Sequence, residues 1–185
     1  MLRKLGIGTV AVLGALALFV ATRPAAFHIE RSTTIAAPPE LVFALVNDLH
    51  EWPRWSPYEK RDPGMKREYA GAAAGEGASY RWDGNDDVGA GLITVTRSVP
   101  GQLVALRLEF ARPFVATNEV EFAFQGSGDE TRVVWGMDGR NGFVGKLLSL
   151  LFDVDAMVGK DFEAGLAAMK AAAEAASREA PGRPS

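Results

Sequence analysis

Acid–base chemistry has few side chains to draw on in this chain of 185 residues. The sequence contains two histidines, His28 and His50, and no cysteine. Thiolate metal sites, disulfide frameworks and cysteine nucleophiles are therefore excluded, and histidine-based schemes have little to work with. His28 belongs to an alternating segment and His50 stands beside Trp52, so both are interpreted as surface or local structure rather than as catalytic residues.

Carboxylates on alternating segments are the other candidates for general acid–base work. Glu119 and Glu121 flank the apolar face to which Phe122 belongs, and Asp138 follows Met137. Side chains of successive strand residues point to opposite faces, so these carboxylates are expected to point away from the apolar side. We therefore predict no catalytic residue and no titratable pair that converges inside the fold.

Metal and cofactor sites are not predicted either. Asp86 and Asp87 stand in a glycine-rich loop, but no third ligand follows at the spacing of a calcium loop, so a turn is the better interpretation. Nucleophile-elbow, Walker and dinucleotide motifs do not occur. With 20 basic and 23 acidic residues, the net charge of −3 gives no reason to expect a nucleic-acid partner.

Apolar and aromatic residues, by contrast, are concentrated on one parity of several predicted strands and on one predicted helix. A binding site for a small apolar molecule needs such a lining and only a few polar groups. For each residue, ordinary core packing is the alternative, and the two differ by whether a void remains. The candidate ligand-binding residues are Tyr80, Trp82, Leu106, Leu108, Phe110, Phe122, Phe124, Trp135, Met137, Phe162 and Leu166.

Seven alternating segments predict a sheet. Glycine and turn residues separate them at short intervals, as is typical of antiparallel hairpins. One face of the sheet is apolar and the other polar, so a second layer must cover the apolar face. The predicted strands are 27–35, 65–69, 78–83, 91–99, 103–110, 116–125 and 131–138.

Helical signals precede and follow these strands. Pro38 and Pro39 suit the start of a short buried helix, and Trp52 and Trp55 are expected to anchor the bent segment after it. Asp153 can cap a long helix. The apolar stripe of that helix consists of Val154, Met157, Val158, Phe162, Leu166 and Met169. We predict an α+β fold in which the seven-stranded antiparallel sheet wraps around this helix and leaves an internal cavity.

Residues 5–22 form an uncharged apolar run between Arg3–Lys4 and Arg23. As a helix the run spans about 27 Å, enough to cross a membrane. Signal-peptide cleavage sites need small residues, which are poorly placed before Arg23, so an uncleaved anchor is preferred to a cleaved signal segment or a core helix. The surplus of basic residues before the run predicts a cytoplasmic N-terminus and a folded domain on the outer, periplasmic or extracellular, side.

Three parts are therefore expected: a membrane anchor or signal segment at 1–26, a folded domain at 27–176 and a disordered tail at 177–185. Without residues 1–22 the chain has 18 basic and 23 acidic residues, a net charge of −5. An acidic body has little electrostatic reason to lie on anionic lipid.

Four stretches carry a resemblance to a known superfamily. They are 35–43, 48–57, 131–139 and 158–166, read as IAAPPELVF, DLHEWPRWSP, TRVVWGMDG and VGKDFEAGL. The chain resembles the SRPBCC or START-like helix-grip superfamily, which includes START lipid-transfer domains, the major birch pollen allergen, polyketide cyclases and activators of the Hsp90 ATPase. It is most similar to the bacterial polyketide cyclase/dehydrase and lipid transport group. The resemblance covers 27–176 and implies fold more specifically than activity.

The resemblance implies three alternative functions. Binding or transfer of a small hydrophobic ligand or lipid in the cavity is preferred, because the positions expected to face the cavity are apolar. A polyketide cyclase or dehydratase would need an acid and a base inside. A protein-interaction module like the Hsp90 ATPase activators would need an exposed apolar patch, for which 143–152 is the candidate, although we expect this stretch to be buried as a lid over the cavity.

Overall fold

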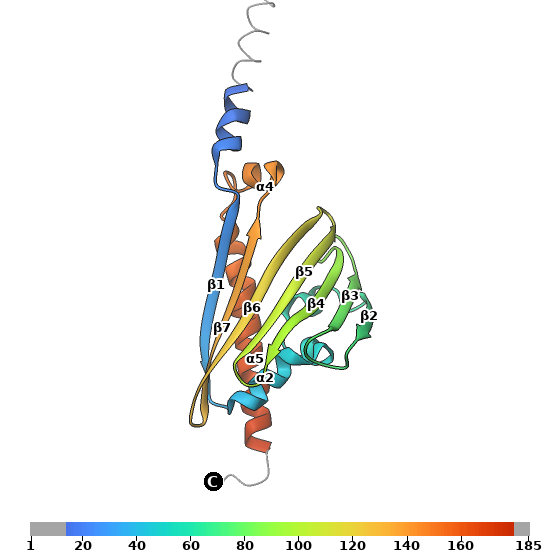
Figure 1. Cartoon of the computed structure of the whole chain (residues 1–185), viewed down its shortest axis with the longest axis vertical. Coiled ribbons are helices and arrows are strands. Elements are labelled where there is room, and N and C mark those ends of the chain that lie inside the picture. The colour runs from blue at the N-terminus through green and yellow to red at the C-terminus, as the bar shows by residue number, and fades with distance from the viewer. Residues whose placement is uncertain (1–13, 180–185) are drawn as a thin grey trace, which may run out of the picture.

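A seven-stranded antiparallel sheet curves around a long C-terminal helix in the computed structural model, which describes residues 14–179 (Figure 1). The strand order is β1-β7-β6-β5-β4-β3-β2, so each strand lies beside its neighbour in sequence except where β1 pairs with β7. Every predicted strand is present, with bounds within two residues of those expected. The strands are β1 (Ala26–Ile35), β2 (Lys66–Gly71), β3 (Ala78–Asp83), β4 (Ala90–Val99), β5 (Leu103–Arg112), β6 (Ala116–Ser127) and β7 (Glu130–Arg140).

Three short helical segments join β1 to β2. They are α2 (Pro39–Asn47), the 3-10 helix η1 (Leu49–Arg54) and α3 (Pro57–Arg61). The two indoles expected to anchor this region do so: Trp52 Nε1 donates to Val46 O at 3.0 Å, and Trp55 Nε1 donates to Leu45 O at 2.7 Å. Both rings are buried, so η1 is fixed to the end of α2 and to the core.

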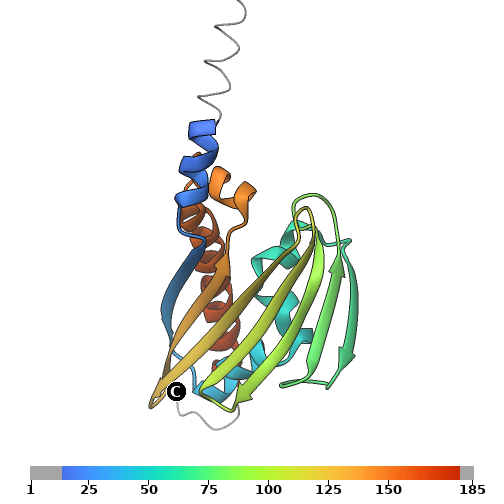
Figure 2. The same ribbon diagram turned by 45° about the horizontal axis from the view of Figure 1, so that its top comes forward.

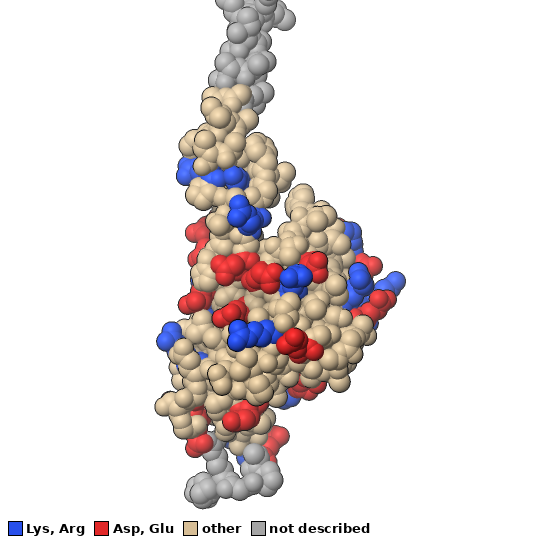
Figure 3. Space-filling model, in the orientation of Figure 1, with Lys and Arg blue, Asp and Glu red and all other residues tan. Residues whose placement is uncertain are grey.

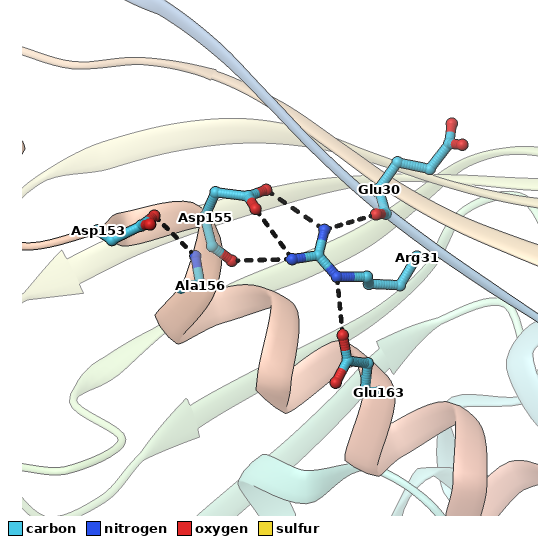
Figure 4. Close-up of polar contacts among 6 residues, drawn as sticks. All are labelled: Glu30, Arg31, Asp153, Asp155, Ala156 and Glu163. Carbon is cyan, nitrogen blue, oxygen red and sulfur yellow. Dashed lines mark hydrogen bonds and ion pairs between the residues drawn. The ribbon is translucent and has the colours of Figure 1, made fainter.

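The long helix α5 (Val154–Glu179) lies on the concave side of the sheet. Its start is capped as predicted, since Asp153 Oδ1 accepts a hydrogen bond from Ala156 N at 2.9 Å (Figure 4). The helix continues to Glu179, so residues 177–179, which were assigned to the tail, are helical and Ser177 is buried. Met157 was wrongly placed in the apolar stripe: it is 60% exposed, because it lies about 100° around the helix from Val158.

Arg31 of β1 fastens the first turns of α5 to the sheet. Its guanidinium donates to Asp155 Oδ2 at 2.9 Å, to Glu163 Oε1 at 3.0 Å and to Glu30 O at 2.8 Å (Figure 4). A Cβ at Gly159 would lie 2.0 Å from this guanidinium, so the glycine makes the close approach possible. The position of α5 over β1 is therefore set by charge as well as by packing.

The two ends of the sheet differ in what they carry. One end, called here the α4 end, holds the start of β1, the β3–β4 and β5–β6 turns, the end of β7 and the short helix α4 (Phe143–Leu148). Residues 14–22 are helical and lie beside α4 in both views (Figures 1 and 2). Lys146 Nζ donates to Ala21 O at 3.1 Å and joins the two.

The structure tests the prediction for residues 143–152 but describes only part of the predicted N-terminal anchor. Within residues 14–179, no helix is long and apolar enough to span a membrane. Much of the predicted anchor, residues 5–13, lies outside the described residues. The expectation that 143–152 is buried as a lid is wrong, because α4 has no buried residue and Leu151 is 72% exposed. The first turns of α5 cover the sheet instead, and 143–152 lies beyond the sheet end.

Candidate functional site

A cavity of about 390 Å³ lies between the concave face of the sheet and α5. It occupies the half of the concave face nearer the α4 end, because its walls come from the parts of β3 to β7 that reach that end and from the first turns of α5. The apolar lining residues are Phe27, Trp52, Met65, Tyr80, Trp82, Val88, Ile93, Leu106, Leu108, Phe110, Val120, Trp135, Met137, Val154, Val158 and Phe162.

Eight of the eleven candidate binding residues line this cavity, namely Tyr80, Trp82, Leu106, Leu108, Phe110, Trp135, Met137 and Phe162. Phe122, Phe124 and Leu166 are buried in solid core instead. The Phe122 ring is stacked on Trp135 at 4.8 Å between ring centroids, and the Phe124 ring meets Phe43 edge-on at 5.7 Å. These side chains have the expected parity but lie farther along their strands, where α2 and η1 already fill the space.

Polar groups that the sequence interpretation missed stand in the cavity wall. Glu59 of α3 is 6% exposed, and its Oε1 accepts a hydrogen bond from Tyr80 Oη at 2.5 Å. Its Oε2 accepts from Arg67 Nε at 2.8 Å and forms an ion pair with the same guanidinium. Since Glu59 and Tyr80 both line the cavity, the prediction that no titratable pair converges inside is wrong.

The chemistry of this pair is constrained by its partners. Burial, followed by the hydrogen bond to Glu59, raises the pKa of the Tyr80 phenol well above its ordinary value. Tyr80 is therefore a neutral hydroxyl near neutral pH, and its proton is committed to Glu59. Both oxygens of Glu59 are occupied, one by Tyr80 and one by Arg67. The arrangement is a hydrogen-bonded polar point in an apolar wall.

A second polar group in the cavity wall lies where α3 faces α5. Tyr58, Arg61 and Asp161 line this side, and the Arg61 guanidinium pairs with the Asp161 carboxylate. Burial, with the charge of Asp161 as a further cause, raises the pKa of Tyr58 far above its ordinary range. This side of the wall offers a neutral phenol and a paired carboxylate.

The position of Arg67 in the alternating pattern of β2 could have indicated that a buried carboxylate such as Glu59 lies nearby. Arg67 shares its parity with Met65 and Tyr69, so an arginine stands on the apolar face of β2. A guanidinium on a covered face requires a carboxylate partner. The partner comes from a five-residue helix, whose orientation no periodicity predicts.

The acid–base candidates of the sequence analysis, including both histidines, lie outside the cavity wall. Glu119, Glu121 and Asp138 are exposed on the outer face, as predicted. His28 Nδ1 lies 2.9 Å from Asp138 Oδ1, and this hydrogen bond raises the pKa of the histidine. His50 is stacked on Tyr69 with 4.1 Å between ring centroids. Neither imidazole faces the cavity.

The Asp86–Asp87 loop forms a turn in which the Asn85 side chain accepts hydrogen bonds from the backbone of Asp87 and Val88. Asp87 nevertheless reaches the edge of the cavity wall. Across residues 14–179, no three histidine or carboxylate side chains gather closely enough to hold a metal ion.

Comparison with known proteins places this geometry in a family. The model of a family described as polyketide cyclase / dehydrase and lipid transport matches residues 26–174. None of the curated proteins matches the chain. Solved structures that share the fold include an aromatase/cyclase and an Aha1 protein. The Zhui aromatase/cyclase from Streptomyces sp. R1128 has a TM-score of 0.64 at 20% identity, over 85% of this chain and 99% of that one. The Aha1 dimer from Colwellia psychrerythraea has a TM-score of 0.57 at 16% identity, over 80% of this chain and 96% of that one.

Proposed function

Because the chain belongs to the polyketide cyclase/dehydrase and lipid transport family, we propose that it binds a small hydrophobic molecule or lipid in the cavity. The observation that carries this proposal is the cavity of about 390 Å³ between α5 and the apolar face of the sheet. This volume lies within the range of small-molecule pockets, which are largely apolar with a few polar groups. The exposed positions of the histidines and outer carboxylates support binding over catalysis.

The polar points in the wall suit a ligand with an apolar body and at least one polar group. The Tyr80 proton is held by Glu59, so its oxygen remains as an acceptor toward the cavity. A hydroxyl or amide on the ligand would find this acceptor without displacing an ion pair. The rest of the wall is mostly apolar and would bind the apolar surface of the ligand.

We also propose that residues 5–22 tether the domain to a membrane, with the N-terminus in the cytoplasm and the domain on the outer side. The support is the uncharged 18-residue run and the basic residues before it. Intact-mass measurement of the membrane fraction tests this part. A mature chain that starts near Phe27 in a soluble fraction would contradict it.

Filling the cavity is the direct test of ligand binding. Leu108→Trp adds an indole to the wall and should weaken binding of an apolar fluorescent probe at least about tenfold, equivalent to about 1.4 kcal/mol. Met169→Leu is the matched control, because Met169 is fully buried outside the cavity and the exchange conserves volume. If the unsubstituted chain binds no apolar probe, or if both variants weaken binding equally, the proposal fails.

A second candidate function, cyclase- or dehydratase-like catalysis, is favoured by the Glu59–Tyr80 pair. In that case Tyr80→Phe should abolish turnover of a polyketide-like substrate while the apolar probe still binds. Binding remains the preferred proposal, because both oxygens of Glu59 are already engaged and the pKa of Tyr80 is displaced away from neutrality.

A further inference from the structure

Large apolar side chains are exposed almost exclusively at the α4 end. Twelve of the thirteen such residues between 14 and 179 lie there, and Tyr69 is the exception. They come from the helix at 14–22, the β5–β6 turn, the 143–152 stretch and the first turn of α5. Val115 is 88% exposed and Leu151 is 72% exposed. Exposed apolar patches of this kind mark interaction surfaces.

The topology brings these distant segments together. Phe110 pairs with Ala116, so the β5–β6 turn caps two strands at this end. Ala26 pairs with Arg140, so the helix before β1 and the 143–152 stretch after β7 leave the sheet side by side. Figures 1 and 2 show the resulting group of tips beyond the sheet edge. The surface is therefore made of convex tips rather than of one flat face.

The segments that carry most of the exposed apolar side chains are basic, although the β3–β4 turn and the start of α5 at the same end carry Asp86, Asp87, Asp153 and Asp155. The segments 14–23, 112–116 and 140–152 contain four basic residues and no acidic one, whereas the chain has a net charge of −3. The four are Arg23, Arg112, Arg140 and Lys146, of which Arg112 is paired with Asp83. In Figure 3 basic side chains lie at the narrow part next to the grey residues, and the wider part of the molecule carries both acidic and basic side chains.

We propose that the α4 end lies on the surface of a lipid bilayer, with its apolar tips among the acyl chains and its basic side chains at the phosphates. Continuity with the apolar run identifies the occupant, because residues 5–22 lead directly into this group of tips. Convex apolar tips beside basic residues suit an interface between hydrocarbon and headgroups. All 23 acidic residues lie outside segments 14–23, 112–116 and 140–152, so the negative net charge of the chain is not the charge of the apolar tips.

The same surface gives the cavity a route to lipid, a step that rests on the proposed ligand binding. A groove of about 500 Å³ lies between the start of β1 and residues 149–155. Phe27 and Val154 line both this groove and the cavity. A ligand that enters from the bilayer would thus pass a groove wall that is apolar at Leu151 and Phe152 and polar at Asn141, before it meets Phe27 and Val154.

The absence of cysteine from the sequence makes a clean test possible. Leu151→Cys and Val115→Cys place a polarity-sensitive fluorophore on two different tips, and Ser127→Cys places it on the exposed β6–β7 turn at the opposite end. The full chain is reconstituted in vesicles of phosphatidylcholine and phosphatidylglycerol that carry a nitroxide on the acyl chain. The dyes at residues 151 and 115 should be quenched severalfold more than the dye at residue 127.

Each other result overturns the inference. Equal quenching at all three positions, or quenching at residue 151 without residue 115, would show that the α4 end does not lie on the bilayer although the tether holds. A dye at residue 151 that is shielded from water but not quenched would assign this surface to a protein partner or a second copy. A chain that stays in solution would refute both the tether and the docking. Probe binding to the cavity, measured on the same samples, reports separately on the proposed ligand site.

Discussion

The concave face of the sheet has two halves built from the same strands and the same alternate residues. One half borders a cavity, here called the hollow half, and the other is packed core, here called the filled half. In the half near the α4 end, Leu108, Val120 and Met137 border a cavity. Farther along these strands, Val104 and Phe122 are completely buried in solid core. The difference lies in the covering layer, since α2 contacts β5, β6 and β7 in the filled half. Whether an apolar strand residue becomes core or cavity wall is therefore decided by the helices above it.

The largest expected loss of stability comes from removing a large side chain from the filled half. Phe122→Ala removes a fully buried ring held between Trp55 and Trp135 and should lower the free energy of unfolding by about 3–5 kcal/mol. Affinity for an apolar probe in the remaining folded chain should change little, because Phe122 does not line the cavity. Denaturant titration and probe binding measure the two effects.

Leu108→Ala is the matched comparison in the hollow half. Its side chain already borders empty space and is half-buried, so the loss of stability should be clearly smaller. Equal losses for the two variants would mean that the halves are packed alike, and would break the comparison.

The sequence predicted the strands well because alternation and turn residues report directly on a half-buried sheet. It predicted the apolar face but could not divide that face, since Phe122 and Leu108 show the same local pattern. It also missed Glu59, whose burial depends on Arg67 and Tyr80 from two other elements. The prediction that residues 143–152 are buried was wrong, because apolar composition alone does not show whether another part of the fold covers a segment.

The next effect concerns the Glu59 carboxylate in the wall of the hollow half. Glu59→Gln removes the charge that pairs with Arg67, whose side chain is mostly buried, and should cost about 1–3 kcal/mol of stability. Glu119→Gln is the control, because its pairing with Arg107 at 3.3 Å is exposed and should contribute less than about 1 kcal/mol. Denaturation at constant pH measures both. Similar values would show that the Glu59 group is not part of the packed wall.

Trp135 lies at the boundary between the two halves, because it lines the cavity and stacks on Phe122. We expect the stability of this boundary to change when a single methyl group is added at Gly165. A Cβ at Gly165 would lie 2.7 Å from Trp135 Cζ3, so Gly165→Ala must displace the indole that closes the cavity. Overpacking offset by the helix preference for alanine gives an expected loss of about 1–2 kcal/mol. Gly14→Ala is the control, because nothing lies within 4 Å of a Cβ at this helical glycine, and the exchange should change stability by less than about 1 kcal/mol. A neutral Gly165→Ala would mean that Trp135 can move freely at the boundary.

The smallest effect lies on the outer face of the hollow half, where His28 is paired with Asp138. The hydrogen bond to Asp138 raises the pKa of His28 in the folded chain, so the pair contributes most stability below about pH 6.5, the unfolded value. That contribution is lost as the pH rises through the raised pKa. It should be less than about 1 kcal/mol, since both side chains are more than half exposed. Comparison of denaturation midpoints for the unsubstituted chain and His28→Gln across this pH range should isolate the contribution of the pair.

Probe binding should not follow the same titration, because His28 borders the groove between β1 and residues 149–155 and does not line the cavity. If binding did follow it, the inner and outer faces of this half would be coupled, and the division between a passive outer surface and a ligand-binding interior would be wrong.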